Sequence, residues 1–140
     1  MTAYITDATV VAEFLLAGPY TANATRFFRQ ALLGDTFIVP DLCLNECTNV
    51  LWKAVRFRGM PSSQAAHAVR DLRALPLRRA ATKAVLEQAL DIGLRRQLAV
   101  YDSIYIALAL RTQLPLVTFD GKQEQAARAE GVNIVAITDF

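Results

Sequence analysis

Four acidic residues stand beside apolar segments of this 140-residue chain. Asp7 follows the run AYIT, Asp102 precedes the run SIYIALAL, and Asp120 follows the run PLVTF. The fourth, Glu46, lies inside the segment LCLNECTNVLW. If folding brings these carboxylates together, they repel one another strongly unless a cation binds among them. Oxygen ligands favour a hard divalent ion, Mg²⁺ or Mn²⁺, and such an ion supports hydrolysis of a phosphodiester bond.

Each acid also has a simpler explanation. Asp7 and Asp102 could be N-caps of the helices that follow them, and Asp120 could belong to an Asp-Gly turn. Glu46 could lie on a solvated polar face of its helix, with Asn49 one turn further on. If that face turns toward the sheet instead, Asn49 could orient the Glu46 carboxylate or a water. Capping alone does not explain the full charge at each position, because Ser, Thr or Asn would cap as well.

The hydrophobic pattern alternates strand and helix. Short apolar runs bounded by turn residues predict strands at 2–6, 36–39, 115–119 and 133–137, with a further extended piece near 98–101. Helical patterns fill the intervals, at 8–17, 22–33, 41–58, 62–74, 79–96, 102–113 and 122–130. The strands are continuously apolar, which is typical of a parallel sheet covered on both faces, so we expect an α/β fold. Ligands of such sheets bind beyond the carboxyl ends of the strands, where Asp7 and Asp120 fall.

Composition restricts the class of protein. Hydrophobic residues make up 54% of the chain and the mean hydropathy is +0.26, which fits a buried sheet or an apolar surface reserved for a partner. We expect one domain over residues 1–140. The longest apolar run is too short to span a bilayer, and the N-terminus lacks a basic segment, so a cytoplasmic location is expected. Cys43 and Cys47 with the single His67 are too few for a zinc site, so we expect reduced core thiols.

The charge balance favours a polyanionic substrate. The net charge is +2, and without the four acids the rest of the chain carries +6. A basic body around an acidic metal pocket suits nucleic acid, which the cations hold while the metal masks the acids. Candidate contacts are Lys53, Arg56, Arg58 and Lys122.

Four blocks in order over nearly the whole chain resemble the PIN-domain family, in particular VapC-type toxins of toxin–antitoxin pairs. They are ITDATVVAEFLL, PDLCLNECTNVLWK, AVYDSIYIALAL and LVTFDGKQEQAARAEGVNIV. The third is the most specific, because a Tyr-Asp pair enters a helix rich in Tyr and Ala. In the fourth, Thr118 stands two residues before Asp120. The segment GKQEQ after Asp120 is more polar than the family pattern.

The resemblance implies a three-layer α/β/α sandwich around a mostly parallel sheet of four to five strands. It also implies an endoribonuclease that depends on Mg²⁺ or Mn²⁺. The family's acidic quartet falls on Asp7, Glu46, Asp102 and Asp120, with the three aspartates as direct metal ligands. Glu46 would bind through water or help to deprotonate the attacking water, and Thr118 would hydrogen-bond a carboxylate or a metal-bound water.

The resemblance further implies partners. Such toxins form homodimers and are held inactive by a small VapB-type antitoxin in a hetero-oligomer. Helices 22–33 and 62–74, with Phe27, Phe28 and Leu32, could form part of the covered surface or could be ordinary core. Two other classes of protein compete with the nuclease. One is a PIN-like module that binds RNA or protein without cutting, and the other is a receiver-like phosphotransfer domain, which would need an acid pair after the first strand.

Overall fold

A parallel sheet of four strands lies at the centre of the computed structural model, which describes residues 1–140. The strands follow the order β3–β2–β1–β4, and every neighbouring pair is parallel. They are β1 (Ala3–Thr6), β2 (Thr36–Pro40), β3 (Leu77–Ala80) and β4 (Leu116–Val117). The predicted α/β fold with a parallel sheet is therefore confirmed.

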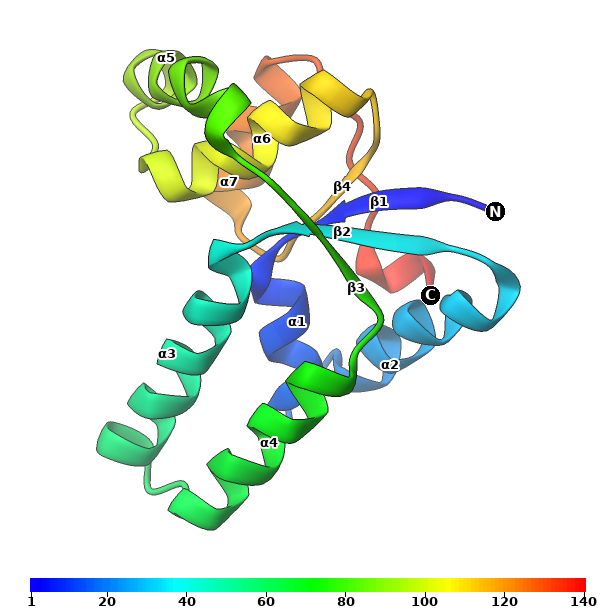
Figure 1. Ribbon diagram of the computed structural model, residues 1–140, viewed down its shortest axis with the longest axis vertical. Helices are drawn as coiled ribbons and strands as arrows, with labels where there is room; N and C mark the ends of the chain where they lie inside the picture. The colour runs from blue at the N-terminus through cyan, green and yellow to red at the C-terminus, as the bar shows by residue number, and fades with distance from the viewer.

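Helices cover both faces of the sheet (Figure 1). On one face lie α1 (Ala8–Leu15), α2 (Thr21–Arg29), α3 (Leu42–Arg58) and α4 (Ser62–Ala74). On the other lie α5 (Leu86–Arg96), α6 (Val100–Thr112) and α7 (Gly121–Ala129). Three short 3₁₀ turns complete the chain: η1 (Gln30–Leu33), η2 (Lys83–Val85) and η3 (Ile137–Asp139). The arrangement is the three-layer sandwich that the resemblance implied. None of the helices has the length and apolar character needed to cross a bilayer.

Helix α6 is the centre of the core. Seven consecutive residues, 103–109, are buried, and the helix packs against β1, β2 and β4 on one side and α5 and α7 on the other. A helix enclosed in this way must be apolar around its whole circumference, as the run SIYIALA is. On the opposite face of the sheet, the rings of Tyr4, Phe27, Phe28, Phe37 and Phe140 pack mostly edge to face, while Tyr4 and Phe37 are stacked and Phe27 and Phe28 are tilted. Phe27 and Phe28 are thus core residues, whereas Leu32 is 87% exposed.

The structure corrects the helix predicted over 79–96. Residues Leu77–Ala80 form the edge strand β3, paired along its length with β2, and the helix α5 begins only at Leu86. The side chains of Arg78 and Arg79 are exposed, so this strand has no apolar run to reveal it. Its backbone pairing with β2 supplies the stabilisation, while the arginines protect the open edge from further pairing.

Two other predicted extended segments are shorter than expected. Within 133–137, only Ile134 forms a bridge, to Leu116, and a 3₁₀ turn begins at Ile137. Within 98–101, Val100 and Tyr101 already belong to α6. Cys43 and Cys47 are buried free thiols, as predicted.

The order of the strands creates a switch point between β1 and β4. The chain runs from β1 outward through β2 to β3, and then returns to place β4 on the opposite side of β1. The backbone N–H of Asp7 donates to the carbonyl of Val117 at 3.0 Å, so these two strands end side by side. Crevices at switch points of parallel sheets bind ligands, and the residues after β1 and β4 line this one.

An ion-pair cluster ties α5 to α7. The guanidinium of Arg95 donates to both carboxylate oxygens of Glu130 at 3.0 and 2.7 Å, and Arg96 donates to the same carboxylate at 2.6 Å. The Glu130 side chain is only 9% exposed. Hydrogen bonds from these two arginines, the one from Arg95 first, lower the pKa of Glu130 to about 2 despite its burial.

We expect Glu130→Gln to destabilise the protein by about 2 kcal/mol at pH 7, because two arginines lose their carboxylate. A lowered pKa contributes stability above the ordinary value of 4.5 that is lost as the pH falls toward 2. The difference between wild type and variant should therefore shrink between pH 4.5 and pH 2 in urea unfolding. A difference that stayed constant over that range would contradict this role.

Candidate active site

Asp7 is the most buried carboxylate of the predicted quartet and accepts the most hydrogen bonds. It lies directly after β1 and is 3% exposed. Its Oδ2 accepts hydrogen bonds from the hydroxyls of Thr9 at 2.6 Å and Thr118 at 3.0 Å, and from the backbone N–H of Thr9 at 3.3 Å. The last contact is the N-cap of α1, so Asp7 does cap this helix. The two threonine hydroxyls bind the same carboxylate in addition, which capping alone does not explain. Burial raises the pKa of Asp7, and the hydrogen bonds from Thr9, Thr118 and Gln123 oppose that rise.

Asp120 follows β4 and caps α7. One oxygen, Oδ1, accepts from the backbone N–H groups of Lys122 at 2.9 Å and Gln123 at 3.1 Å. Its own N–H donates to the hydroxyl of Thr118 at 2.9 Å. Thr118 therefore joins Asp7 to the Asp120 backbone, which supports the expectation that this threonine hydrogen-bonds a carboxylate. The second oxygen, Oδ2, has no partner within the chain.

Gln123 is a residue of this site that the sequence analysis missed. Its side chain is fully buried, and the amide nitrogen donates to Asp7 Oδ1 at 3.4 Å and to the Asp102 carbonyl at 3.1 Å. Since both neighbours are acceptors, the nitrogen must face them, and the amide oxygen is left buried without a partner. The sequence held one signal for this residue, the unusual polarity of GKQEQ. Gln123 follows the Asp120 cap by three residues, and its side chain points back toward the site.

Asp102 differs most from its expected surroundings. Helix α6 begins at Val100, with Ala99 as its N-cap, so Asp102 lies in the first turn and does not cap the helix. The capping alternative for Asp102 is therefore wrong, and its carboxylate accepts no hydrogen bond from the chain. Burial, then the charges of Asp7 and Asp120, raise the pKa of Asp102, while Lys122 opposes the shift. A carboxylate at this helix N-terminus remains free to bind a ligand.

Glu46 faces the site from α3. Its Oε1 accepts a hydrogen bond from the hydroxyl of the buried Tyr105, on α6, at 2.9 Å. Burial, followed by the charges of Asp7 and Asp102, raises the pKa of Glu46 to about 7, against the opposing effect of that hydrogen bond. Glu46 thus does not lie on a fully solvated face. Tyr105, which belongs to the Tyr- and Ala-rich helix, makes the contact that the sequence analysis assigned to Asn49.

The rest of α3 is turned slightly from the predicted orientation. The spacing of apolar residues in the sequence predicts a buried stripe of Leu44, Cys47, Leu51 and Val55. The buried face in the structure consists instead of Cys43, Cys47, Leu51 and Ala54. This rotation leaves Asn49 and Lys53 exposed. Asn49 and Lys53 line a small cavity of about 250 Å³ with Glu46 and Thr9, so these two polar side chains lie at the outer border of the site.

The four acids influence one another but are not held by cations. The charges of Asp7 and Asp120 raise the pKa of Asp102, and the charges of Asp7 and Asp102 raise the pKa of Glu46. The salt bridges of the chain join other residues, and none includes a member of this quartet. The quartet is therefore a region of negative charge that no salt bridge neutralises. Bringing like charges into one partly buried region costs free energy that a bound cation would offset.

The donor set fits a hard divalent cation. All candidate ligands are carboxylate, hydroxyl or amide oxygens, which Mg²⁺ and Mn²⁺ prefer, and Asp102 and one oxygen of Asp120 are unused. No three acidic, cysteine or histidine side chains lie close enough together to hold one ion by themselves. Mg²⁺ is usually held by one or two carboxylates, with waters and substrate phosphate completing its shell, so this spacing agrees with its ordinary coordination.

We expect Glu46→Gln to stabilise the protein by about 1–2 kcal/mol at pH 8 in EDTA. A carboxyl group with a raised pKa favours folding in its neutral form, and that stability is lost as the pH rises from 4.5 through 7. The amide removes the penalty, so the gain should vanish below about pH 4.5. Urea unfolding at pH 4 and pH 8 tests this, and an equal effect at both pH values would contradict the raised pKa.

Comparison with known proteins identifies the family and supports the fold. The sequence model of the PIN domain family matches residues 4–129. Among curated proteins, no sequence matches. Among solved structures, PAE2754 from Pyrobaculum aerophilum superposes with a TM-score of 0.77 at 18% identity, over 99% of this chain and 85% of the other.

Two further neighbours are VapC proteins. VapBC2 from Rickettsia felis, solved bound to a DNA fragment from its promoter, has a TM-score of 0.69 at 12% identity, over 96% of this chain and 98% of the other. VapC20 from Mycobacterium tuberculosis, a toxin that cleaves the sarcin–ricin loop, has a TM-score of 0.65 at 19% identity, over 89% and 95%. These likenesses concern the fold, while the match over 4–129 identifies the family: the chain belongs to the PIN domain family.

Proposed function

We propose that this chain is a metal-dependent endoribonuclease and the toxin of a toxin–antitoxin pair. The observation that carries the proposal is the group of four carboxylates beyond the ends of β1 and β4. Burial raises the pKa of Asp7, Glu46 and Asp102, and none of the four acids forms a salt bridge. This arrangement needs a cation, and PIN-fold neighbours include toxins of such pairs. The non-catalytic alternative gives no reason to keep all four charges in one region.

The aspartates are the proposed metal holders. Asp7, Asp102 and Asp120 would hold Mg²⁺ or Mn²⁺, one or two of them directly and the rest through bound water, and Glu46 would contact the ion through water. When bound, the ion would lower the pKa of water and neutralise charge on the phosphate that is cut.

The protein residues would orient the carboxylates and move a proton. Thr9, Thr118 and Gln123 hold the Asp7 carboxylate from three sides, which keeps it in one orientation. Tyr105 occupies Oε1 of Glu46 and leaves Oε2 free to accept a proton from the attacking water. A pKa of about 7 suits a general base near neutral pH. As the new P–O bond forms, the bond to the leaving oxygen breaks, and solvent supplies that oxygen with a proton.

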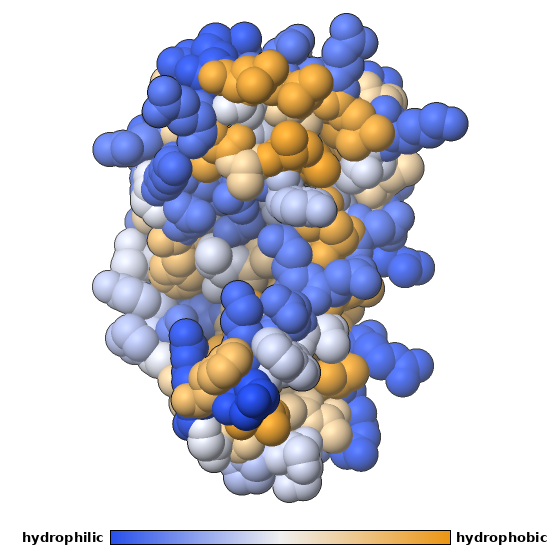
Figure 2. All heavy atoms as spheres, turned by 90° about the vertical axis from the view of Figure 1, so that its left-hand side faces the viewer, coloured by the Kyte–Doolittle hydropathy of each residue, from blue (hydrophilic) through white to orange (hydrophobic).

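The proposal includes a VapB-type antitoxin, a homodimer and the expected cytoplasmic location. Support for protein partners comes from the exposed apolar side chains. Leu86, Leu90 and Leu94 of α5 lie four residues apart and are 47%, 49% and 73% exposed, and Tyr101 nearby is 65% exposed. Figure 2 shows apolar side chains gathered over the upper part of the face on which α5 lies. A patch of this kind is typical of a surface that a protein partner covers.

We expect Asp102→Asn to reduce RNA cleavage at least 100-fold with Mg²⁺ or Mn²⁺, because a neutral amide is a poor ligand for either ion. The fold should remain intact, since the carboxylate makes no hydrogen bond. Asp91→Asn, an exposed acid on α5, is the matched control and should cut like wild type. The proposal fails if wild type cuts no RNA with either ion and calorimetry detects no metal binding.

Gln123→Leu should weaken Mn²⁺ binding about 10-fold, because Asp7 loses one of the donors that orient it. The variant should also be less stable, since buried acceptors lose their partner. The melting temperature of each protein is therefore measured with and without Mn²⁺, and the rise caused by Mn²⁺ is compared between the proteins. Gln125→Leu, an exposed change on the same helix, is the control. An unchanged Mn²⁺-induced rise in Gln123→Leu would leave the residue a purely structural role.

A further inference from the structure

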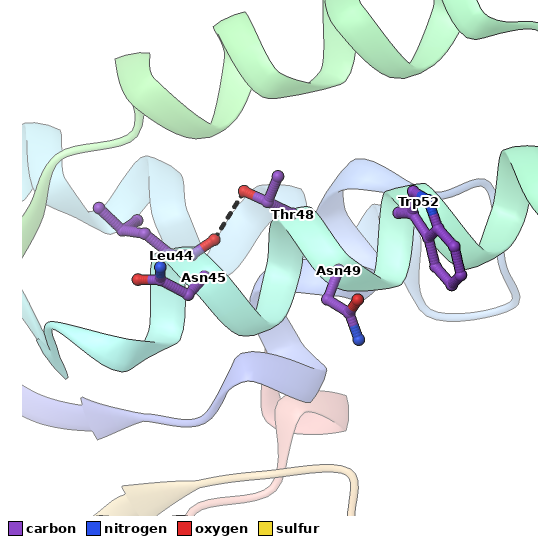
Figure 3. A pocket seen from close by; sticks show the side chains of 5 residues that line it. All are labelled: Leu44, Asn45, Thr48, Asn49 and Trp52. Carbon is purple, nitrogen blue, oxygen red and sulfur yellow. Dashed lines mark hydrogen bonds between the residues drawn. The ribbon is translucent and has the colours of Figure 1, made fainter.

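A groove runs along the outer face of α3, beside the candidate active site. It has a volume of about 550 Å³ and is lined by Leu44, Asn45, Thr48, Asn49 and Trp52. Figure 3 shows the side chains of Asn45, Asn49 and Trp52 following one another along the helix, while the Thr48 hydroxyl is turned to the carbonyl of Leu44. The groove therefore presents two free amides and one indole to a ligand. None of these residues is used by the proposed chemistry.

Trp52 is an exposed aromatic surface with support from behind. It is 56% exposed and lies edge-on to Phe57, with ring centroids 5.8 Å apart, and the guanidinium of Arg56 lies 5.5 Å from the Phe57 ring centre. Phe57 therefore contacts the indole and leaves more than half of its side chain exposed. An exposed, supported indole is a platform on which a flat ligand can stack.

The same end of α3 is basic. Lys53, Arg56 and Arg58 lie within two turns of Trp52, and none of them forms a salt bridge. A stacking surface beside unpaired cations fits a ligand that carries both an aromatic ring and negative charge. Asn45 and Asn49 add hydrogen-bond donors and acceptors for the polar edge of such a ring. An apolar protein segment would leave these amides and cations without partners.

The groove borders the acidic site. Asn49 lines both this groove and the smaller cavity that holds Glu46, Thr9 and Lys53. A chain-like ligand could thus lie along α3 with one phosphate near the acids and a neighbouring base against Trp52. Only an unpaired nucleotide has a base free to stack in this way.

We propose that the α3 groove binds single-stranded RNA, with one unpaired base stacked on Trp52 and the adjoining backbone held by Lys53 and Arg56. This assignment rests on the proposed function, because it names the residue that binds a base of the RNA beside the cleavage site. It selects RNA in a loop or an open strand over RNA in a duplex.

Trp52 is the only tryptophan of the chain, so its fluorescence reports on this groove alone. The Asp102→Asn protein, which prevents cutting, is titrated with a short unstructured RNA and with the same RNA annealed to its complement. Saturable quenching by the single strand and little quenching by the duplex are the expected results. Absence of quenching at concentrations where a fluorescent label on the RNA reports binding would overturn the proposal.

Affinity provides the second arm. Trp52→Ala should weaken single-strand binding about 10-fold and Trp52→Phe less, as measured by anisotropy of labelled RNA. Lys53→Ala should reduce the salt dependence of binding by about one ion. Leu33→Ala, an exposed apolar change in η1, is the control and should bind like wild type. Melting curves of each variant verify folding, and equal affinity for wild type and Trp52→Ala would overturn the assignment.

The two proposals can fail separately. If RNA quenches Trp52 and the wild type cuts nothing with either metal, RNA binding in the groove is supported and the proposed nuclease activity is wrong. If the wild type cuts RNA and Trp52→Ala binds and cuts equally well, the proposed nuclease activity is supported and RNA binding in the groove is wrong. If an acidic peptide quenches Trp52 and RNA does not, the groove is a protein-binding site and the RNA assignment is wrong.

Discussion

The negative charge beside β1 is the constraint on which the rest of the structure depends. Asp7 is almost completely buried, yet the groups around it are hydroxyls and an amide, not a lysine or arginine. Neutral donors reduce the cost of burying a carboxylate but do not cancel its charge, as the raised pKa of Asp7 records. The nearby Asp102 and Glu46 add to this repulsion. A protein that served stability alone would replace such residues with apolar ones.

The surrounding elements are arranged to hold that charge in place. The switch point puts the ends of β1 and β4 side by side, so Thr118 reaches Asp7 from the neighbouring strand. Gln123 then connects α7 to the first turn of α6. Buried helix α6 supplies Tyr105 to Glu46 across the layer boundary. Asp7 and Glu46 are thus oriented by side chains from other elements, so the packing of the core fixes the position of these two carboxylates.

Helix α3 performs two tasks on different faces. Cys43, Cys47 and Leu51 anchor it in the core, and Glu46 projects from one edge of that face toward the acids. Its outer face carries the groove, the exposed indole and the unpaired cations. Because one rigid helix bears both, a ligand seated on Trp52 would have a defined position relative to Glu46. This coupling connects substrate choice to chemistry without requiring any movement of the fold.

Much of this protein could be predicted from the sequence alone, because the signals are local. Continuous apolar runs predicted a parallel sheet with helices on both faces, and the four acids were found from their positions beside those runs. Edge strand β3 was missed, since Arg78 and Arg79 carry no apolar pattern and the strand exists through pairing with β2. The orientation of α3, the replacement of Asn49 by Tyr105, and the roles of Gln123 and Trp52 were decided only by tertiary structure. Those contacts join residues far apart in the chain, and a difference of one residue in how a helix packs is enough to exchange an inward side chain for an outward one.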